Sequence, residues 1–211
     1  MLPAWNPTSK EIPSPTHRGE PDTLQIDAAV GRALSEYEHL QSALGILFQL
    51  LCEAPSFAAS RAFGTVDSAS GHVAMLRAAE EVFFGTREPL DAKDAEYHAE
   101  MKALFSASEK AQEFRNNIAH GMASQCRIGD NAQGFGFLSG YFLCPPPYSM
   151  KKVAMVAPKE QYLLEAKYFY SVADINHYRD RFTQLVHEAY RLASEINGKY
   201  KILEIKQIIP G

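Results

Sequence analysis

Hydrophobic residues recur at steps of three and four positions along most of the chain, which is the spacing that gives an α-helix one buried face. This pattern predicts helices over four ranges: residues 24–52, 57–84, 91–122 and 173–197. Pro55 ends the first range because proline cannot continue a helix, whereas Gly64 and Gly71 predict a break inside the second. Gly198 is the expected C-cap of the last helix. The chain is therefore predicted to be mainly α.

The pattern changes between about residues 129 and 170, where Gly, Pro and aromatic residues accompany short alternating runs. Such runs at 135–142 and 162–170 predict the two strands of a β-hairpin, with Pro145-Pro146-Pro147 in the loop between them. The predicted fold is thus an antiparallel helical bundle with a small β-hairpin inserted after the third long helix.

The two ends of the chain differ from this helical domain, which is expected to span residues 23–200. Residues 1–22 carry five prolines among polar residues and are predicted to form an arm, and residues 201–211 a C-terminal tail. No run approaches the roughly 18 apolar residues that span a bilayer, and the first residues lack the regions of a signal peptide. A cytoplasmic protein without a membrane partner is expected.

Composition narrows the classes of partner. The 211 residues are 46% hydrophobic and 22% charged, which suits one globular domain. The formal charge of -4 provides no general attraction to nucleic acid, so any RNA contact is local and no DNA partner is expected. Cys52, Cys126 and Cys144 lack the spacing of a zinc site and are predicted to be small core residues in a reduced compartment.

The segment Arg115-Asn116-Asn117-Ile118-Ala119-His120-Gly121 lies near the end of the third long helix and combines three kinds of chemistry. A guanidinium can hold a phosphate by paired hydrogen bonds, and an imidazole can move protons near neutral pH. Asn116 and His120 are four residues apart, so the amide is expected to hydrogen-bond the imidazole and orient it. Arg115, Asn116 and His120 are therefore the candidate residues for metal-free attack on RNA.

A structural interpretation of these residues stays open. Arg115 could be a salt-bridged helix residue, and His120 could be favoured at a helix C-terminus by the helix dipole. Loose spacing alone does not decide, because two further pairs share it: Arg32 with His39, and Arg181 with His187. Only Arg115 is followed by Asn, and only His120 is followed by Gly at a helix end.

The pattern Arg115-Asn116-x-x-x-His120 resembles the signature of the HEPN superfamily, the higher eukaryotes and prokaryotes nucleotide-binding domains. Those domains are similar in layout, with two long antiparallel helices, further packing helices, and the motif near the end of a core helix. The resemblance covers residues 24–198. It implies a homodimer in which two motif helices meet about a twofold axis, so that both copies of Arg115 and His120 line one cleft. The small residues Ser108, Ala111 and Ala119 would permit that close approach.

The resemblance also implies a metal-independent endoribonuclease without a cofactor. His120 would act as general base or acid for attack by the ribose 2′-OH, Arg115 would stabilise the phosphorane, and Asn116 would orient or bind. RNA and an antitoxin or other regulatory protein are the implied partners, and a toxin, stress or defence role is implied. Met122 stands where one toxin branch has a modified Tyr, so regulation of that kind is in doubt. The alternative is a non-catalytic dimeric HEPN-like module that binds a nucleotide or a protein.

Other polar groups have structural explanations that weigh more than functional ones. His72 with Ser68 fits a helix-start cap, and the acids between Asp91 and Glu100 fit a solvated helix N-terminus better than a metal site. Base stacking is one role for the tyrosines of the 129–170 region, but packing is the expected one: Tyr141, Tyr148, Tyr162, Tyr168 and Tyr170.

Overall fold

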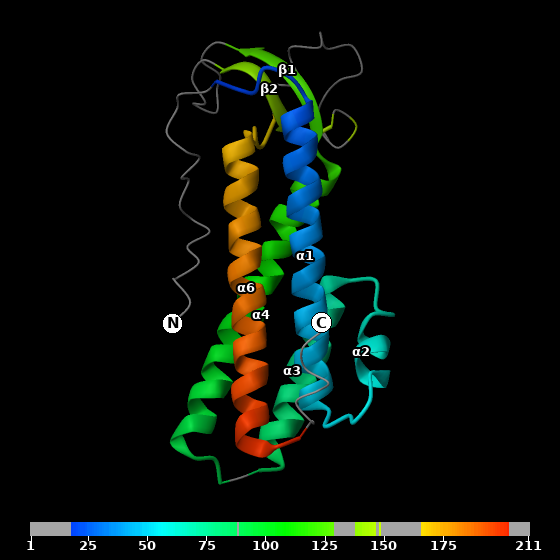
Figure 1. Cartoon of the computed structure of the whole chain (residues 1–211), viewed down its shortest axis with the longest axis vertical. Helices are drawn as coiled ribbons and strands as arrows, with labels where there is room; N and C mark the ends of the chain where they lie inside the picture. Colours follow the sequence, from blue (N-terminus) through cyan, green and yellow to red (C-terminus); the bar gives the residue numbers. More distant parts are fainter. Residues whose placement is uncertain (1–17, 88, 129–137, 147, 149–165, 203–211) are drawn as a thin grey trace. The chain divides into compact units, whose positions relative to one another are not determined.

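The computed structural model describes residues 18–87, 89–128, 138–146, 148 and 166–202. It is mainly helical with one two-stranded antiparallel sheet, which confirms the predicted fold class. The elements follow the order α1 (Leu24–Leu51), α2 (Ala58–Phe63), α3 (Ala69–Gly85), α4 (Ala92–His120), β1 (Met122–Ile128), β2 (Leu138–Cys144) and α6 (Val172–Tyr200) (Figure 1). No helix in these ranges is both long enough and apolar enough to cross a membrane.

Side chains at the helix starts explain where the helices begin. At α4 the Asp91 carboxylate accepts from the amides of Lys93 and Asp94 at 2.9 Å, and the Asp94 carboxylate accepts from the Asp91 amide at 3.2 Å. At α6 Ser171 and Asp174 exchange the same pair of hydrogen bonds. Such reciprocal capping satisfies amides that a helix cannot pair internally.

Two details of the helix boundaries test the predictions made from glycines. The break predicted within residues 57–84 is confirmed, because α2 and α3 are separate helices. The C-cap predicted at Gly198 is wrong, since α6 continues to Tyr200. Lys201 takes the cap position instead, with a φ of 53° and an amide that donates to the Asn197 carbonyl at 2.7 Å.

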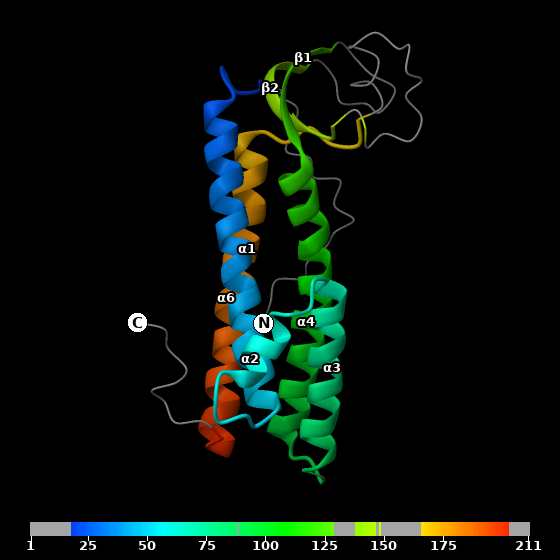
Figure 2. The same ribbon diagram turned by 90° about the vertical axis from the view of Figure 1, so that its right-hand side faces the viewer.

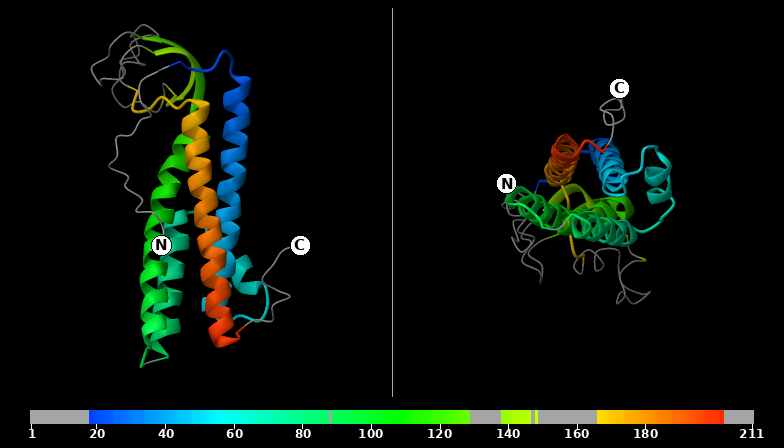
Figure 3. Two further views of the ribbon diagram at one scale, coloured as in Figure 1. Left: turned by 60° about the vertical axis from the view of Figure 1, so that its left-hand side comes forward. Right: turned by 90° about the horizontal axis from the view of Figure 1, so that it is seen from below.

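The chain divides into two compact units, and the first comprises described residues 37–87, 89–112 and 181–202. In it the later part of α1, all of α2 and α3, the first part of α4 and the last part of α6 pack together (Figure 3). Tyr37 and Phe182 meet edge to face with ring centroids 5.4 Å apart, joining α1 to α6. The core consists of buried apolar side chains from every helix of the unit, among them Leu40, Leu44, Phe63, Leu76, Phe83, Leu104 and Phe105.

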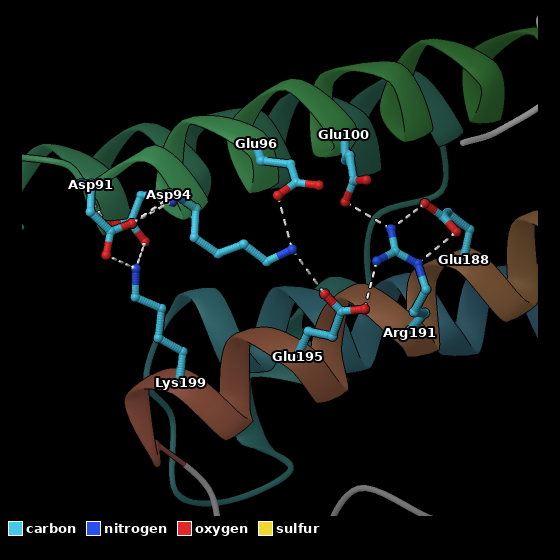
Figure 4. A network of polar contacts seen from close by, with 9 residues as sticks. Asp91, Asp94, Glu96, Glu100, Glu188, Arg191, Glu195 and Lys199 are labelled. Carbon is cyan, nitrogen blue, oxygen red and sulfur yellow. Dashed lines mark hydrogen bonds and ion pairs between the residues drawn. The ribbon is translucent and has the colours of Figure 1, made fainter.

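Ion pairs join α4 to α6 within the first unit (Figure 4). The Arg191 guanidinium contacts Glu100 of α4 at 2.8 Å as well as Glu188 and Glu195 of its own helix. Lys199 contacts Asp94 at 2.5 Å, and the Tyr200 hydroxyl also donates to that carboxylate. Because the start of α4 meets the end of α6, these two helices run antiparallel. The acids after Asp91 are thus engaged in ion pairs, as the structural interpretation predicted.

The second unit comprises described residues 18–36, 113–128, 138–146, 148 and 166–180. In it α4 leads directly into β1, and β1 pairs antiparallel with β2, with Met122 opposite Cys144 and Ile128 opposite Leu138 (Figure 2). The predicted hairpin was placed too late in the chain. Its 135–142 run overlaps β2, but the partner of β2 is β1, and Pro145 follows the second strand because proline lacks the amide that a ladder needs.

The strand predicted at 162–170 lies outside the described residues up to 165, and its last residue forms only one bridge, between Tyr170 and Leu143. The arm boundary at residue 22 is also corrected. Gly19 and Glu20 hydrogen-bond the backbone of β2, and Glu20 accepts from the Val172 amide at 3.1 Å. Residues 1–17 and 203–211, which hold the rest of the predicted arm and most of the tail, lie outside the described residues.

Replacing Asp94 tests the junction between α4 and α6. Burial alone would raise the pKa of this carboxyl, but hydrogen bonds from Lys199 and Tyr200 outweigh it and hold the pKa below its ordinary value. A lowered pKa stabilises the fold above about pH 4, and that gain is lost as the pH falls through the folded-state value. Asp94→Asn should therefore lower the free energy of unfolding by about 2 kcal/mol at pH 7.

The measurement is urea unfolding of both proteins between pH 7 and pH 2.5. The difference between them should shrink as the pH falls below about 4. Glu96→Gln is the matched control, because Glu96 pairs with Lys93 where both side chains are about half exposed, and it should change the stability little. A difference that stays constant across the pH range would contradict the assignment of the stability to the ionised Asp94.

Candidate functional site

The candidate residues lie on the last two turns of α4, in the second unit. Arg115 and Asn116 are half-buried, and an Arg115 Nη1 donates to Asn116 Oδ1 at 3.3 Å. His120 is the last residue of the helix and is exposed. The structure thus brings the guanidinium and the amide together and leaves the imidazole open to solvent.

The hydrogen bond predicted between Asn116 and His120 does not form among the described residues. Their spacing of four residues places them on one side of the helix, but the Asn116 oxygen accepts from the neighbouring Arg115 instead. A hydrogen bond to a charged donor is stronger than one to a neutral imidazole, which favours this partner. The orientation of His120 therefore depends on the helix end itself.

Two tyrosines hold that helix end through Asn117, a residue that the sequence interpretation did not assign a role. The Tyr168 hydroxyl donates to the Asn117 carbonyl at 2.9 Å, and the Asn117 amide donates to the Tyr170 hydroxyl at 3.3 Å. These partners are more than 50 residues away in the chain, so no local pattern could reveal them. The only signal in the sequence is the doubled asparagine after Arg115.

Aromatic rings continue from these tyrosines onto α6. Tyr168 stacks on Tyr170 with centroids 4.5 Å apart, Tyr170 lies 5.2 Å from Tyr178, and Tyr178 stacks on Phe114 of α4 at 4.3 Å. Burial raises the pKa of each of the three phenols above its ordinary value. Packing, and not an open platform for bases, is therefore the role of Tyr168 and Tyr170, as predicted.

Gly121 allows the helix end to approach β2 closely. A Cβ at this position would lie 2.6 Å from Leu143 Cγ and 2.9 Å from the Asn117 carbonyl oxygen. Leu143 in turn exchanges two backbone hydrogen bonds of 2.9 Å with Tyr170. The glycine, the strand and the tyrosine segment therefore meet at the end of α4.

The other sequence candidates do not form a second site among the described residues. Ser68 caps α3 by accepting from the Gly71 amide at 3.1 Å, as predicted. His72 stacks on Phe63 at 4.1 Å with its Nδ1 2.8 Å from Gln41. No cluster of three His, Cys, Asp or Glu side chains in the described ranges has the arrangement of a metal site.

The prediction for the cysteines is confirmed for two of the three. Cys126 and Cys144 are buried, with their sulfur atoms 3.7 Å apart and unbonded. Cys52 is exposed, contrary to the prediction, because it follows the last residue of α1.

Small residues of α4 are less available for a dimer than the sequence indicated. Ser108 and Ala111 are buried within their own chain, where the Ser108 hydroxyl donates to the Leu104 carbonyl at 2.9 Å. Ala119 is half-buried, and Met122 just after the helix is 44% exposed. Any partner of the motif helix would therefore meet its last turn.

Comparisons with models of known protein families, with curated proteins and with solved structures find no match to this chain. The function is consequently argued from the motif and from the geometry of the helix end.

Substituting Gly121 tests how tightly the helix end is packed. Gly121→Ala should lower the free energy of unfolding by about 1–3 kcal/mol, because the added methyl group meets Leu143 inside normal contact distance. Gly198→Ala is the control in α6, where a Cβ meets nothing within 4 Å, and it should stabilise by about 0.5–1 kcal/mol. Chemical denaturation measures both, and equal effects of the two substitutions would contradict the close approach.

Proposed function

We propose that this protein is a metal-independent endoribonuclease of the HEPN type. The observation that carries the proposal is the exposed His120 on the last turn of α4, one turn beyond the hydrogen-bonded pair of Arg115 and Asn116. A base that must take a proton from a bound RNA has to be accessible, and a guanidinium near it can hold the phosphate. Both conditions are met on one short helical segment.

The reaction uses the RNA itself as the nucleophile. His120 removes the proton from a ribose 2′-OH, the 2′ oxygen forms a bond to the adjacent phosphorus, and the bond to the 5′ oxygen breaks after that oxygen receives a proton. Arg115 stabilises the negative charge that develops on the phosphorane. Asn116 holds the guanidinium by their hydrogen bond. The products are a 2′,3′-cyclic phosphate and a 5′-hydroxyl.

The proposal includes a twofold homodimer in which the last turns of two α4 helices face each other. Exposed His120 and Met122 lie at that end of the helix, whereas Ser108 and Ala111 are covered within the chain. A cytoplasmic toxin, stress or defence role, with an antitoxin or other regulatory protein as partner, is part of the same proposal.

One observation favours the non-catalytic alternative, a dimeric HEPN-like binding module. Arg115 already donates to Asn116, and the imidazole of His120 is not bonded to that amide. A site of this kind can hold a nucleotide phosphate or a protein carboxylate without moving a proton. The two proposals differ in what happens to RNA, which the first experiment measures.

Cleavage of end-labelled RNA by the purified protein should depend on both charged residues. His120→Ala should lower the rate by about 10²–10⁴-fold, since it removes a general base or acid. Arg115→Lys should also lose much of the rate, because an ammonium cannot form paired hydrogen bonds to a phosphate. His187→Ala is the control, since His187 is an exposed histidine elsewhere on α6.

Chelator should leave the rate unchanged, and a 2′-deoxy residue at the scissile position should block the reaction. If the parent protein leaves a broad panel of RNAs intact, or if His120→Ala cuts as fast as the parent, the nuclease proposal falls and the binding module replaces it.

Sedimentation equilibrium should show a dimer at roughly 10–50 μM, the range in which a micromolar interface is populated. Met122→Lys should shift the protein toward monomer, because it places a charge at the proposed contact. Leu90→Lys replaces another exposed hydrophobic residue, outside the motif region, and should leave the dimer intact. A parent protein that sediments as a monomer over this range would overturn the composite site.

A further inference from the structure

The last turn of an α-helix has four carbonyl groups without an amide partner inside the helix. In α4 these belong to residues 117–120, and His120 is the last of them. A helix end whose carbonyls are bonded only to water frays readily, and its side chains then sample several directions. What bonds the first of these carbonyls therefore affects where His120 points.

Tyr168 supplies that bond, with its hydroxyl 2.9 Å from the Asn117 carbonyl. The tyrosine is itself fixed on both sides. Its ring stacks on Tyr170, whose backbone is joined to Leu143 of β2 by two hydrogen bonds of 2.9 Å. The Tyr170 hydroxyl also accepts from the Asn117 side chain at 3.3 Å. Asn117 is thus held at its carbonyl and at its amide, three residues before His120.

We propose that Tyr168 is a positioning residue for His120: its hydroxyl fixes the last turn of α4 so that the imidazole keeps one orientation toward the RNA. This inference rests on the proposed ribonuclease function and deepens it. Tyr168 does not touch the substrate. It acts through the Asn117 carbonyl, so removal of its hydroxyl loosens the turn while the ring and its stacking stay in place.

The chemistry of the phenol suits a fixed donor. Burial raises the pKa of Tyr168 above its ordinary value, so the hydroxyl keeps its proton throughout the range in which RNA cleavage would be measured. The neighbours that face it act in the same direction, since Tyr170 and Cys144 also raise this pKa. The bond to Asn117 is consequently present at every pH at which His120 titrates.

Tyr168→Phe tests the proposal, because it removes one oxygen atom and keeps the stacked ring. Tyr190→Phe is the matched control, a half-buried tyrosine on α6 in the other unit. Three quantities are measured on the full chain: hydrogen exchange of the amides at 118–121, the ring resonances of His120, and the kinetics of RNA cleavage. The resonances are assigned by their absence in His120→Ala.

In Tyr168→Phe the amides at 118–121 should exchange faster while those of residues 101–108 stay unchanged, and the His120 ring signals should shift or broaden. The value of kcat should fall roughly tenfold with KM within about twofold, because the hydroxyl affects the orientation of the base and not the binding of RNA. Tyr190→Phe should change none of these.

Unchanged exchange and unchanged His120 signals in Tyr168→Phe overturn the inference, and so does faster exchange spread evenly over the whole chain, which indicates a structural role alone. Failure of the ribonuclease proposal is a different result. In that case the parent protein cuts no RNA, and the exchange and ring signals still decide whether Tyr168 holds His120.

Discussion

The carbonyls at the end of α4 must find partners, and the second unit is arranged around that requirement. Gly121 lets the chain turn against Leu143 without a Cβ in the way, and Tyr168 reaches the Asn117 carbonyl from a segment bonded to the same strand. Polar backbone groups away from water carry a free-energy cost when they are unpaired. Satisfying them here joins a helix end, a hairpin and the segment before α6.

The same arrangement determines which residues of the motif reach solvent. Ile118 is 1% exposed, and His120 lies two residues later, about 200° around the helix. Anchoring Ile118 in the core therefore directs His120 outward. Arg115 and Asn116, one turn earlier, lie partly under cover and bond to each other. The division between a covered pair and an open imidazole follows from helix geometry and from one buried isoleucine.

Local rules account for what could be predicted from the sequence. The apolar spacing of α1 and the acids that cap α4 act within a few residues, so both helices were predicted with nearly correct bounds. The hairpin was misplaced because its strands are short and its bend depends on Gly140, whose φ of 120° and contact with Gly19 are tertiary features. Likewise, the motif was visible as a pattern, but the tyrosines that hold it lie about 50 residues away.

A catalytic reading of this site also depends on a second proton donor. One imidazole can remove the proton from the 2′-OH, but the departing 5′ oxygen must receive a proton in the same reaction. The tyrosines beside α4 are poor donors near neutral pH, because burial raises their pKa and the Tyr168 hydroxyl is already bonded to Asn117. A second His120, supplied by a twofold partner, has the right chemistry. The proposed dimer and the proposed reaction therefore require each other, and evidence against either one weakens both.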